Sequence, residues 1–318
     1  MASKIETCSE IKNKQIEKIF EKKLNIKPKS ISKINIGFCS DIFNIDNKYI
    51  LKIRKDAVGE KCFEKSYFLL DFFKNKLPCP KKVVFDNSHK IIPYDYGIHK
   101  MIQGDNLFSV WHTYTDKERE QIIKQICSFL KIFINTKYHK SFNNFNLDKN
   151  TDWKKHIENK FRSKIEVVKE KKLLSKFEII KLTNFLDKNI DLLDDKRIVL
   201  IHSDLHFDNF LVKNKKIVGV LDFDSVSYKC IDYPLHIIKR MEVEPKAYFS
   251  ETQENYIRLK DYKKIRSWYK KYFPEMFDFK KINTRVDIYL LERRLKYFIL
   301  YPHSKNCYNQ LIRILNKY

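Results

Sequence analysis

One compact stretch of β-type sequence, set between two long helical regions, constrains the fold of this chain more than any other feature. Residues 197–224 read RIVLIHSDLHFDNFLVKNKKIVGVLDFD. The apolar run 197–201 predicts a strand, and the apolar runs on either side of Asn214-Lys215 predict a hairpin. This hairpin returns Asp222 to the side of Asn209. The segment therefore predicts a small sheet with polar side chains gathered at one end.

The rest of the chain divides into a β-rich region and a longer, mainly helical region. Apolar periodicity predicts helices at 9–24, behind a Ser9 cap, and at 60–74. From Gly104 onward helical patterns dominate, including the capping-box spacing of Thr115 and Glu118. Strands are predicted at 31–36, 41–45, 49–55, 81–86, 89–96 and 97–102, and further helices at 152–170 and 174–189. We expect an α+β fold with an N-terminal lobe at 1–101 and a larger helical lobe at 102–318.

The strong positive charge is a background property of the composition. The chain of 318 residues has 64 Lys and Arg against 40 Asp and Glu, a net charge of +24. A surface for nucleic acid or anionic lipid would produce such an excess. The lysines are nevertheless dispersed and mixed with acids, Asn and Ile, as A+T-rich coding would give, and no run of five basic residues occurs. We therefore expect neither a nucleic-acid partner nor a membrane partner.

The cysteines and the N-terminus indicate a cytoplasmic protein. Seven cysteines are scattered without a C-x-x-C pair, which is typical of reduced thiols and not of a disulfide framework or a zinc site. The first residues, MASKIETCSEIKNK, contain no apolar segment of the kind that a secretory signal needs. No uncharged apolar run approaches the roughly 18 residues of a membrane span.

Oxygen-bearing side chains in the central segment point to phosphoryl transfer. The letters HSDLHFDN fill positions 202–209, and LDFD fills 221–224. Phosphoryl transfer needs a carboxylate near the acceptor hydroxyl, a role that suits Asp204, and hard oxygen ligands for Mg²⁺, which suit Asn209 and Asp222. Taken singly, each is equally typical of a turn, a cap or a satisfied polar residue. Together, H-x-D-x-x-x-x-N and a following D-F-D match the kinase catalytic signature in order and spacing.

These residues resemble the catalytic segment of the aminoglycoside phosphotransferase and choline kinase superfamily, small-molecule kinases of protein-kinase-like fold. The resemblance implies that Asp204 orients the acceptor hydroxyl and takes its proton, that His202 braces the loop, and that Asn209 and Asp222 coordinate Mg²⁺. The chain departs from the usual pattern with Ser203 and Asp208, where Gly or a small residue is common. Two further acids follow: Asp224 replaces the glycine of D-F-G, and Asp232 is expected to be structural.

The resemblance extends to the predicted N-terminal strands. Lys52, in the letters I-L-K-I, is placed like the lysine that holds the α- and β-phosphates of ATP or GTP. Its partner is expected on the next helix, with Glu64 first and Glu60, one turn earlier, as the alternative. The loop that ends at Ser40 lacks G-x-G-x-x-G, so its backbone N–H groups and Ser40 would have to cover the phosphates.

Residues 97–104, GIHKMIQG, occupy the position of the hinge between the lobes. In the kinase-like families a purine edge bonds to backbone groups there, which places the base against His99 to Met101. An ordinary strand that enters a turn is equally compatible with these letters.

The sequence gives opposing indications of the charge of the acceptor. Five acids that would suit a cationic aminoglycoside follow the D-F-D strand, but three basic residues precede them on the next predicted helix, where they would repel a cation. The acids are Glu242, Glu244, Glu251, Glu254 and Asp261, and the basic residues are His236, Lys239 and Arg240. We expect an ATP- or GTP-dependent, Mg²⁺-requiring kinase of a small-molecule hydroxyl, of the aminoglycoside-phosphotransferase type, with a role in antibiotic resistance or in metabolism. The alternatives are a choline, ethanolamine, homoserine or sugar kinase, and a non-catalytic nucleotide-binding regulator.

Overall fold

The computed structural model describes residues 11–34, 40–54, 60–145, 147, 149, 152–248 and 257–318. The chain separates into two compact units. Unit 1 comprises Met1–Leu107 and Asp208–Asp224, and unit 2 comprises Phe108–Phe207 and Ser225–Tyr318. The lobe boundary predicted after residue 101 stays a prediction. It differs from this division chiefly because the hairpin segment 208–224 joins the first unit.

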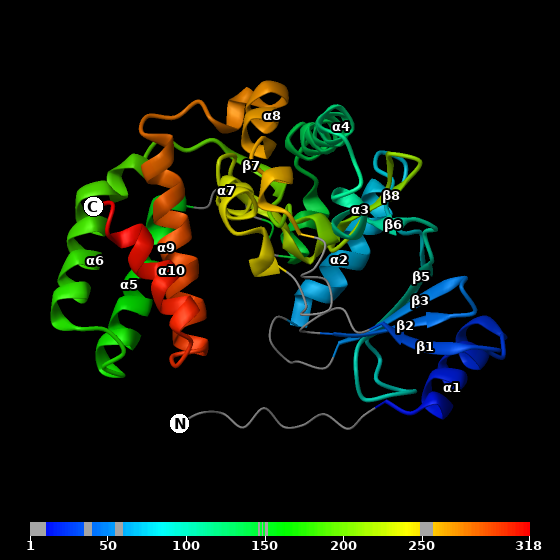
Figure 1. Ribbon diagram of the computed structural model, residues 1–318. Helices are drawn as coiled ribbons and strands as arrows, with labels where there is room; N and C mark the ends of the chain where they lie inside the picture. The colour runs from blue at the N-terminus through cyan, green and yellow to red at the C-terminus, as the bar shows by residue number, and fades with distance from the viewer. Residues whose placement is uncertain are drawn as a thin grey trace. The chain divides into compact units, whose positions relative to one another are not determined.

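Unit 1 is built on a five-stranded antiparallel sheet with the order β1-β2-β3-β5-β4 (Figure 1). Its strands are β1 (Ile31–Ile34), β2 (Ser40–Ile45), β3 (Tyr49–Arg54), β4 (Lys82–Asp86) and β5 (Tyr96–Lys100). The register places Lys52 on β3 opposite Ile42 on β2 and Gly97 on β5. Lys52 therefore projects from an inner strand, where neighbours on both sides fix its backbone.

The turns of this sheet follow from local sequence, with one correction. Three residues, 46–48, connect β2 to β3, and the N–H group of Lys48 donates to the carbonyl of Ile45 at 3.0 Å. Asp46 and Asn47 have φ angles of 55° and 52°, the left-handed conformation that Asp and Asn adopt more readily than most residues. The strand predicted at 89–96 is wrong, because residues 87–95 form bends and irregular backbone and only Tyr96 enters β5. Pro93 lies inside that stretch and has no N–H group to donate to a sheet.

Two helices accompany the sheet of unit 1. Helix α1 (Asn13–Leu24) buries Ile16, Ile19 and Phe20 in a core shared with the apolar residues of β2, β3 and β5. The predicted cap Ser9 lies outside the described residues. Helix α2 (Glu60–Phe73) confirms the predicted helix at 60–74.

A second sheet in unit 1 consists of β6 (Asp105–Asn106), β8 (Phe210–Lys213) and β9 (Lys216–Val220). Asn214 and Lys215 connect β8 to β9 with φ angles of 50° and 60°. The predicted hairpin is therefore confirmed, and its turn has positive φ at both central residues.

Unit 2 is mainly helical. Its long helices are α4 (Asp116–Ile134), α5 (Trp153–Glu170), α6 (Lys176–Asn189), α7 (Leu235–Val243), α8 (Ile265–Tyr272), α9 (Ile282–Leu300) and α10 (Lys305–Leu315), and short α3 (Leu107–Trp111) leads into them. Thr115 and Glu118 form the predicted capping box at the start of α4. Strands β7 (Ile198–His202) and β10 (Val226–Cys230) pair antiparallel. Within the described ranges, none of the helices combines the length and apolar character needed to cross a bilayer.

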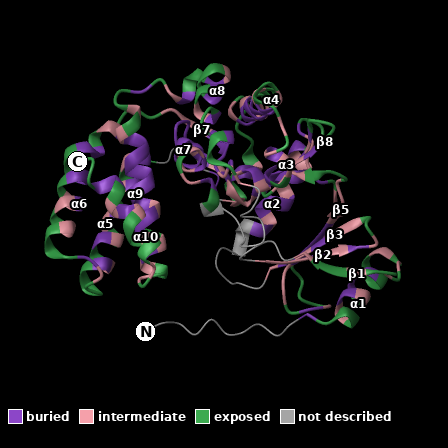
Figure 2. Ribbon diagram, viewed as in Figure 1, coloured by how far each residue is buried: buried purple, intermediate pink, exposed green. Residues whose placement is uncertain are grey.

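Helix α9 is the most buried helix of unit 2 and packs against α5 and α10 (Figure 2). It carries Arg285, whose Nε donates to Asp232 Oδ2 at 2.7 Å, although both side chains are almost wholly buried. The hydroxyl of Tyr289 donates to Asp232 Oδ1 at 3.1 Å and accepts from Trp153 Nε1 at 3.0 Å. These bonds join α5, α9 and the segment before α7, in keeping with the structural role expected for Asp232.

Candidate functional site

The β8–β9 hairpin brings two of the predicted site residues of unit 1 to the same end. The N–H group of Leu221 donates to the carbonyl of Asn209 at 2.8 Å, one pair beyond Phe210 and Val220 of the ladder. Asn209 and Asp222 therefore flank the end of the hairpin, as the sequence predicted.

Asp222 has an unusual backbone conformation. Its φ angle of 56° lies in the left-handed region, where residues other than Gly, Asn and Asp are rare. The residue lies two positions beyond the end of β9 at Val220, so the chain changes direction at the point where it presents this carboxylate. Uncommon backbone angles of this kind concentrate at functional sites.

Lys52 lies between two carboxylates of unit 1. Its Nζ is 3.5 Å from Asp222 Oδ1 and 3.5 Å from Asp224 Oδ2. Burial alone would lower the pKa of the Lys52 amine, but the charges of Asp222 and Asp224 outweigh burial and raise it. The amine is therefore a fixed positive charge at the end of the hairpin.

Asp224 is a site residue to which sequence reasoning gave no role. Besides Lys52, Arg54 of β3 contacts its carboxylate, with 4.0 Å between Arg54 Nη1 and Asp224 Oδ2. The backbone carbonyl of Asp224 accepts a hydrogen bond from Lys65 Nζ at 2.8 Å. Lys65 lies on α2 and is buried. The only local signal was the position of Asp224 two residues beyond Asp222, and its partners lie about 160 to 170 residues away along the chain.

Two other predicted residues form no side-chain hydrogen bond or ion pair with Lys52 among the described residues. Glu64 lies on α2, and among the described residues no hydrogen bond or ion pair joins it to Lys52. The side chain of its alternative, Glu60, lies outside what the structure describes. Ser40 is the first residue of β2, opposite Arg54, and most of the loop before it is also outside the described residues. The roles of Glu64 and Ser40 stay predictions.

The predicted purine site lies at the end of β5. Burial and the charge of Lys52 lower the pKa of His99 to about 4, so its ring is neutral at pH 7. The N–H group of Met101 donates to the carbonyl of Lys48 at 2.9 Å, and that of Lys100 donates to Lys81 at 2.9 Å. These two amides already have partners, so the placement of the base against His99 to Met101 stays a prediction.

Asp204 belongs to unit 2, where His206 contacts it. His206 Nε2 lies 3.3 Å from Asp204 Oδ2. Burial alone would raise the pKa of Asp204, but the hydrogen bond from His206 and the charges of His206, His202 and Arg293 lower it to about 2. Asp204 is therefore ionised at neutral pH.

His202 holds the backbone of this loop. It is buried, and its Nδ1 accepts from the N–H group of Asp204 at 3.4 Å and lies 3.2 Å from Ser225 Oγ. Ser203 Oγ donates to the carbonyl of Ser225 at 2.8 Å and accepts from Lys229 Nζ at 2.6 Å. These bonds hold the loop of Asp204, and the bracing role of His202 stays a prediction. Ser203, which stands where glycine is common, acts as a hydrogen-bonding group.

The donor set in unit 1 fits a magnesium ion that is bound together with a nucleotide. Mg²⁺ usually takes one or two protein oxygens and completes its shell with phosphates and water. The amide of Asn209 and the carboxylate of Asp222 can supply those oxygens. In the part of the chain that the structure describes, no cluster of three or more His, Cys, Asp or Glu forms a metal cage independent of a nucleotide.

The profile of the phosphotransferase enzyme family matches residues 31–235, about two thirds of the chain and the whole of both groups of site residues. The chain belongs to the phosphotransferase enzyme family. No curated protein sequence matches it. The family assignment therefore rests on the profile, and the resemblance inferred from HSDLHFDN and LDFD is confirmed.

Solved structures of aminoglycoside kinases have the same fold. A streptomycin–ATP ternary complex of APH(2")-IIa matches with a TM-score of 0.70 and 16% identity over 97% of each chain. ADP-bound APH(2'')-Ib matches with 0.69 and 16% over 96% of each chain. APH(4)-Ia in a complex with AMP-PNP and hygromycin B matches with 0.64 and 15% over 95% of this chain and 96% of that one. At such identities the likeness shows the fold alone, and the predicted α+β, protein-kinase-like fold is confirmed.

Proposed function

We propose that this protein transfers the γ-phosphoryl group of ATP or GTP to a hydroxyl group of a small molecule. The observation that supports the proposal most is the arrangement in unit 1, where an inner-strand lysine lies between the two carboxylates that follow a catalytic-type hairpin. A cation at Lys52 and oxygen ligands at Asn209 and Asp222 are the groups that a magnesium–triphosphate tail needs.

Each residue would have a distinct task. Lys52 would bind the phosphate oxygens, and Asn209 and Asp222 would hold Mg²⁺. The bound ion would neutralise charge on the β- and γ-phosphate oxygens. Asp204, with its pKa lowered to about 2, is a weak base, so it would orient the acceptor hydroxyl and take its proton late in the transfer.

Steady-state turnover of ATP and GTP with a panel of hydroxyl acceptors tests this function. In Asp204→Asn we expect kcat to fall about 100-fold to 10,000-fold, with the nucleotide Kd unchanged, because the variant loses only the group that orients the hydroxyl. In Lys52→Ala we expect the nucleotide KM to rise by a larger factor than kcat falls.

Asp191→Asn is a matched control, because Asp191 is an exposed aspartate of unit 2 whose carboxylate pairs with Lys154 at 2.6 Å. Its turnover should equal that of the wild type. Unchanged kcat in both Asp204→Asn and Asp222→Asn would defeat the proposed function.

A further inference from the structure

Two helix–helix turns of unit 2 lie at the same end of its helices, the turn from α5 to α6 and the turn from α9 to α10 (Figure 1). The hydroxyl of Tyr308 on α10 donates to Glu178 Oε1 on α6 at 2.5 Å, and its ring centre lies 5.9 Å from that of Phe298 on α9. The fold therefore joins residues 169–180 and 296–308 into one surface, which we term the bundle end.

Large apolar side chains are exposed at the bundle end. Phe177 is 73% exposed, and Ile180, Leu300 and Tyr301 are each more than half exposed. With Tyr308 they make up five of the nine exposed large apolar side chains in the described part of the chain, although the bundle end is a small fraction of its length. Exposed apolar groups that gather in this way mark surfaces that bind a partner.

Exposed lysines accompany these apolar side chains. The bundle end contains six lysines against Glu170 and Glu178, a net charge of +4. Glu178 accepts from the N–H group of Ser175 at 2.7 Å in the cap of α6, and Lys169 pairs with Glu166 at 3.6 Å. The other five lysines are exposed and have no carboxylate partner among the described residues. They are Lys171, Lys172, Lys176, Lys296 and Lys305.

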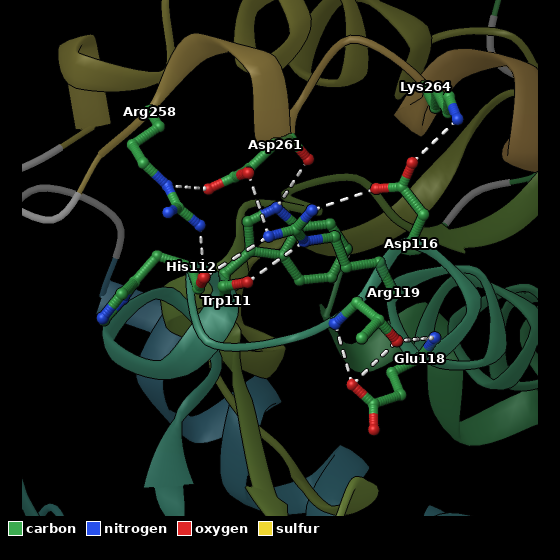
Figure 3. Close-up of polar contacts among 9 residues, drawn as sticks. Trp111, His112, Asp116, Glu118, Arg119, Arg258, Asp261 and Lys264 are labelled. Atoms are coloured by element: carbon green, nitrogen blue, oxygen red, sulfur yellow. Dashed lines mark hydrogen bonds and ion pairs between the residues drawn. The ribbon is translucent and has the colours of Figure 1, made fainter.

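Carboxylates hold basic side chains in another part of unit 2. Figure 3 shows Asp261 held by Arg119 and Arg258, at 3.0 Å and 2.8 Å, and Asp116 held by Lys264 at 2.7 Å. The unpaired lysines of the bundle end differ from these cations, because their charge is left to a partner or to solvent. Two further acids of unit 2 lie outside the described residues, namely Glu251 and Glu254.

Charged and apolar side chains are interspersed over the bundle end. Lys176 and Phe177 are the first two residues of α6. Lys296 lies four residues before Leu300 on α9, which places both on one face of the helix. An anionic bilayer accepts both kinds of side chain, since apolar groups enter the headgroup region while ammonium groups contact the lipid phosphates.

Other occupants fit the bundle end less well. A soluble protein partner would have to cover the lysines, a residue type that is depleted in protein–protein interfaces. A second copy of this chain would bring the same positive surface to the contact, in a molecule with a net charge of +24. The charge and the exposed apolar groups together therefore favour an anionic bilayer.

We propose that the bundle end binds peripherally to membrane surfaces that contain anionic lipids, with Phe177, Leu300 and Tyr301 in the headgroup region and the lysines around them against the lipid phosphates. The spread of lysines along the sequence predicts no membrane partner. Glu178 and Tyr308, which meet at the bundle end, are 130 residues apart, so spacing along the chain cannot report this surface.

Flotation of the full chain with lipid vesicles tests this partner class. The vesicles consist of equal parts phosphatidylserine and phosphatidylcholine, or of phosphatidylcholine alone. We expect binding to the anionic vesicles to be at least about tenfold tighter than to the neutral ones, and to weaken as salt is added. Calorimetric titration with polyglutamate, a soluble acidic polymer, probes the alternative of an acidic protein partner.

A triple variant tests whether the bundle end is the surface that binds. Lys171→Gln, Lys172→Gln and Lys176→Gln together should weaken binding to the anionic vesicles at least about tenfold. A matched control variant removes the same charge from unit 1 and should keep most of the wild-type affinity. Its glutamine substitutions are at three exposed lysines of α1, namely Lys14, Lys18 and Lys22.

A Phe177→Trp variant reports where the lipid contact lies. The three tryptophans of the chain, Trp111, Trp153 and Trp268, are buried, so their emission should not respond to lipid. On anionic vesicles the emission of Phe177→Trp should shift to shorter wavelength and be quenched by brominated acyl chains, because indole rings settle at the headgroup level. Val243→Trp is the matched control, since Val243 is an exposed apolar residue at the end of α7. Its emission should stay unchanged.

Three results would overturn the inference. They are equal binding to the two kinds of vesicle, equal losses of affinity in the two triple variants, and unchanged emission of Phe177→Trp on vesicles that bind the chain. Unchanged emission together with polyglutamate binding that the bundle-end variant loses would assign this surface to an acidic protein. Failure of the kinase function is a separate result, because none of these residues belongs to the groups proposed to bind nucleotide, metal or acceptor.

Discussion

At the scale of single residues, Gly97 fixes how closely α2 approaches the sheet of unit 1. A Cβ at this position would lie 2.0 Å from Tyr67 Cζ and 2.4 Å from its hydroxyl oxygen. Tyr67 is 2% exposed and packs on Phe63 and Phe85, so its ring has no room to move. Because Gly97 pairs with Lys52, a shift of α2 or β5 would also displace the backbone of the lysine.

Gly97→Ala should therefore lower the free energy of unfolding by about 1–3 kcal/mol, the usual cost of overpacking a core. Thermal unfolding followed by circular dichroism, with hydrogen exchange of α2 and β5, measures it. Adding Tyr67→Leu should recover part of the loss, because the ring atoms that clash are removed. Gly219→Ala is the control, since its Cβ would meet only side-chain atoms at 3.1–3.3 Å. Equal losses in the two alanine variants would contradict the argument.

At the scale of elements, the buried Asp232–Arg285 pair holds three helical segments of unit 2 together. Asp232 and Arg285 are both 0% exposed, and Tyr289 and Trp153 continue the bonds toward α5. Removing one member of such a pair leaves a buried charge without its partner, which costs far more than an exposed ion pair contributes.

Asp232→Ala should reduce the free energy of unfolding by about 3–5 kcal/mol. Asp187→Ala, which removes an exposed ion pair with Arg162, should cost at most about 1 kcal/mol. Urea unfolding followed by tryptophan fluorescence is the suitable measurement, because all three tryptophans of the chain lie in unit 2. Similar losses in the two variants would mean that the buried pair is not important for stability.

The elements also show what could be predicted from the sequence. The hairpin turn at Asn214-Lys215 and the capping box of Thr115 and Glu118 are local patterns, and both were predicted because the interacting groups are at most a few residues apart. The partners of Asp224 and the approach of Arg293 to Asp204 depend on packing between segments distant in sequence. No spacing rule along the chain reports such contacts. The motifs HSDLHFDN and LDFD could therefore be recognised from the sequence, and the charged groups around them could not.

At the scale of the whole molecule, acid should destabilise the protein in two stages. Burial lowers the pKa values of His99 and His236 to about 4 and about 3, from ordinary values near 6.5. Groups whose pKa is lower in the folded state favour folding above the unfolded-state pKa, and this contribution is lost as the pH falls. The stability that the two histidines contribute is lost first, as the pH falls below about 6.5. Asp86 and Asp204 also have lowered pKa values, and their contribution is lost below about pH 4.

The midpoint of urea unfolding should consequently fall steadily between pH 7 and pH 4.5, before the carboxylates titrate. His236→Asn should flatten that part of the profile, because the variant has no buried imidazole to protonate on unfolding. A wild-type midpoint that is constant over this range would show that both histidines are well solvated in the folded protein.

The left-handed backbone conformation of Asp222 limits which residues this position can accept during evolution. Gly, Asn and Asp tolerate that conformation, while for other residues it costs about 1 kcal/mol or more of conformational free energy. A single-nucleotide change converts an aspartate codon to a glycine codon, so a descendant could lose the carboxylate proposed to hold Mg²⁺ and keep its fold. Glutamate, the other acid, would keep the charge but strain the chain. Inactive, well-folded copies are therefore more accessible than copies with a longer acidic ligand.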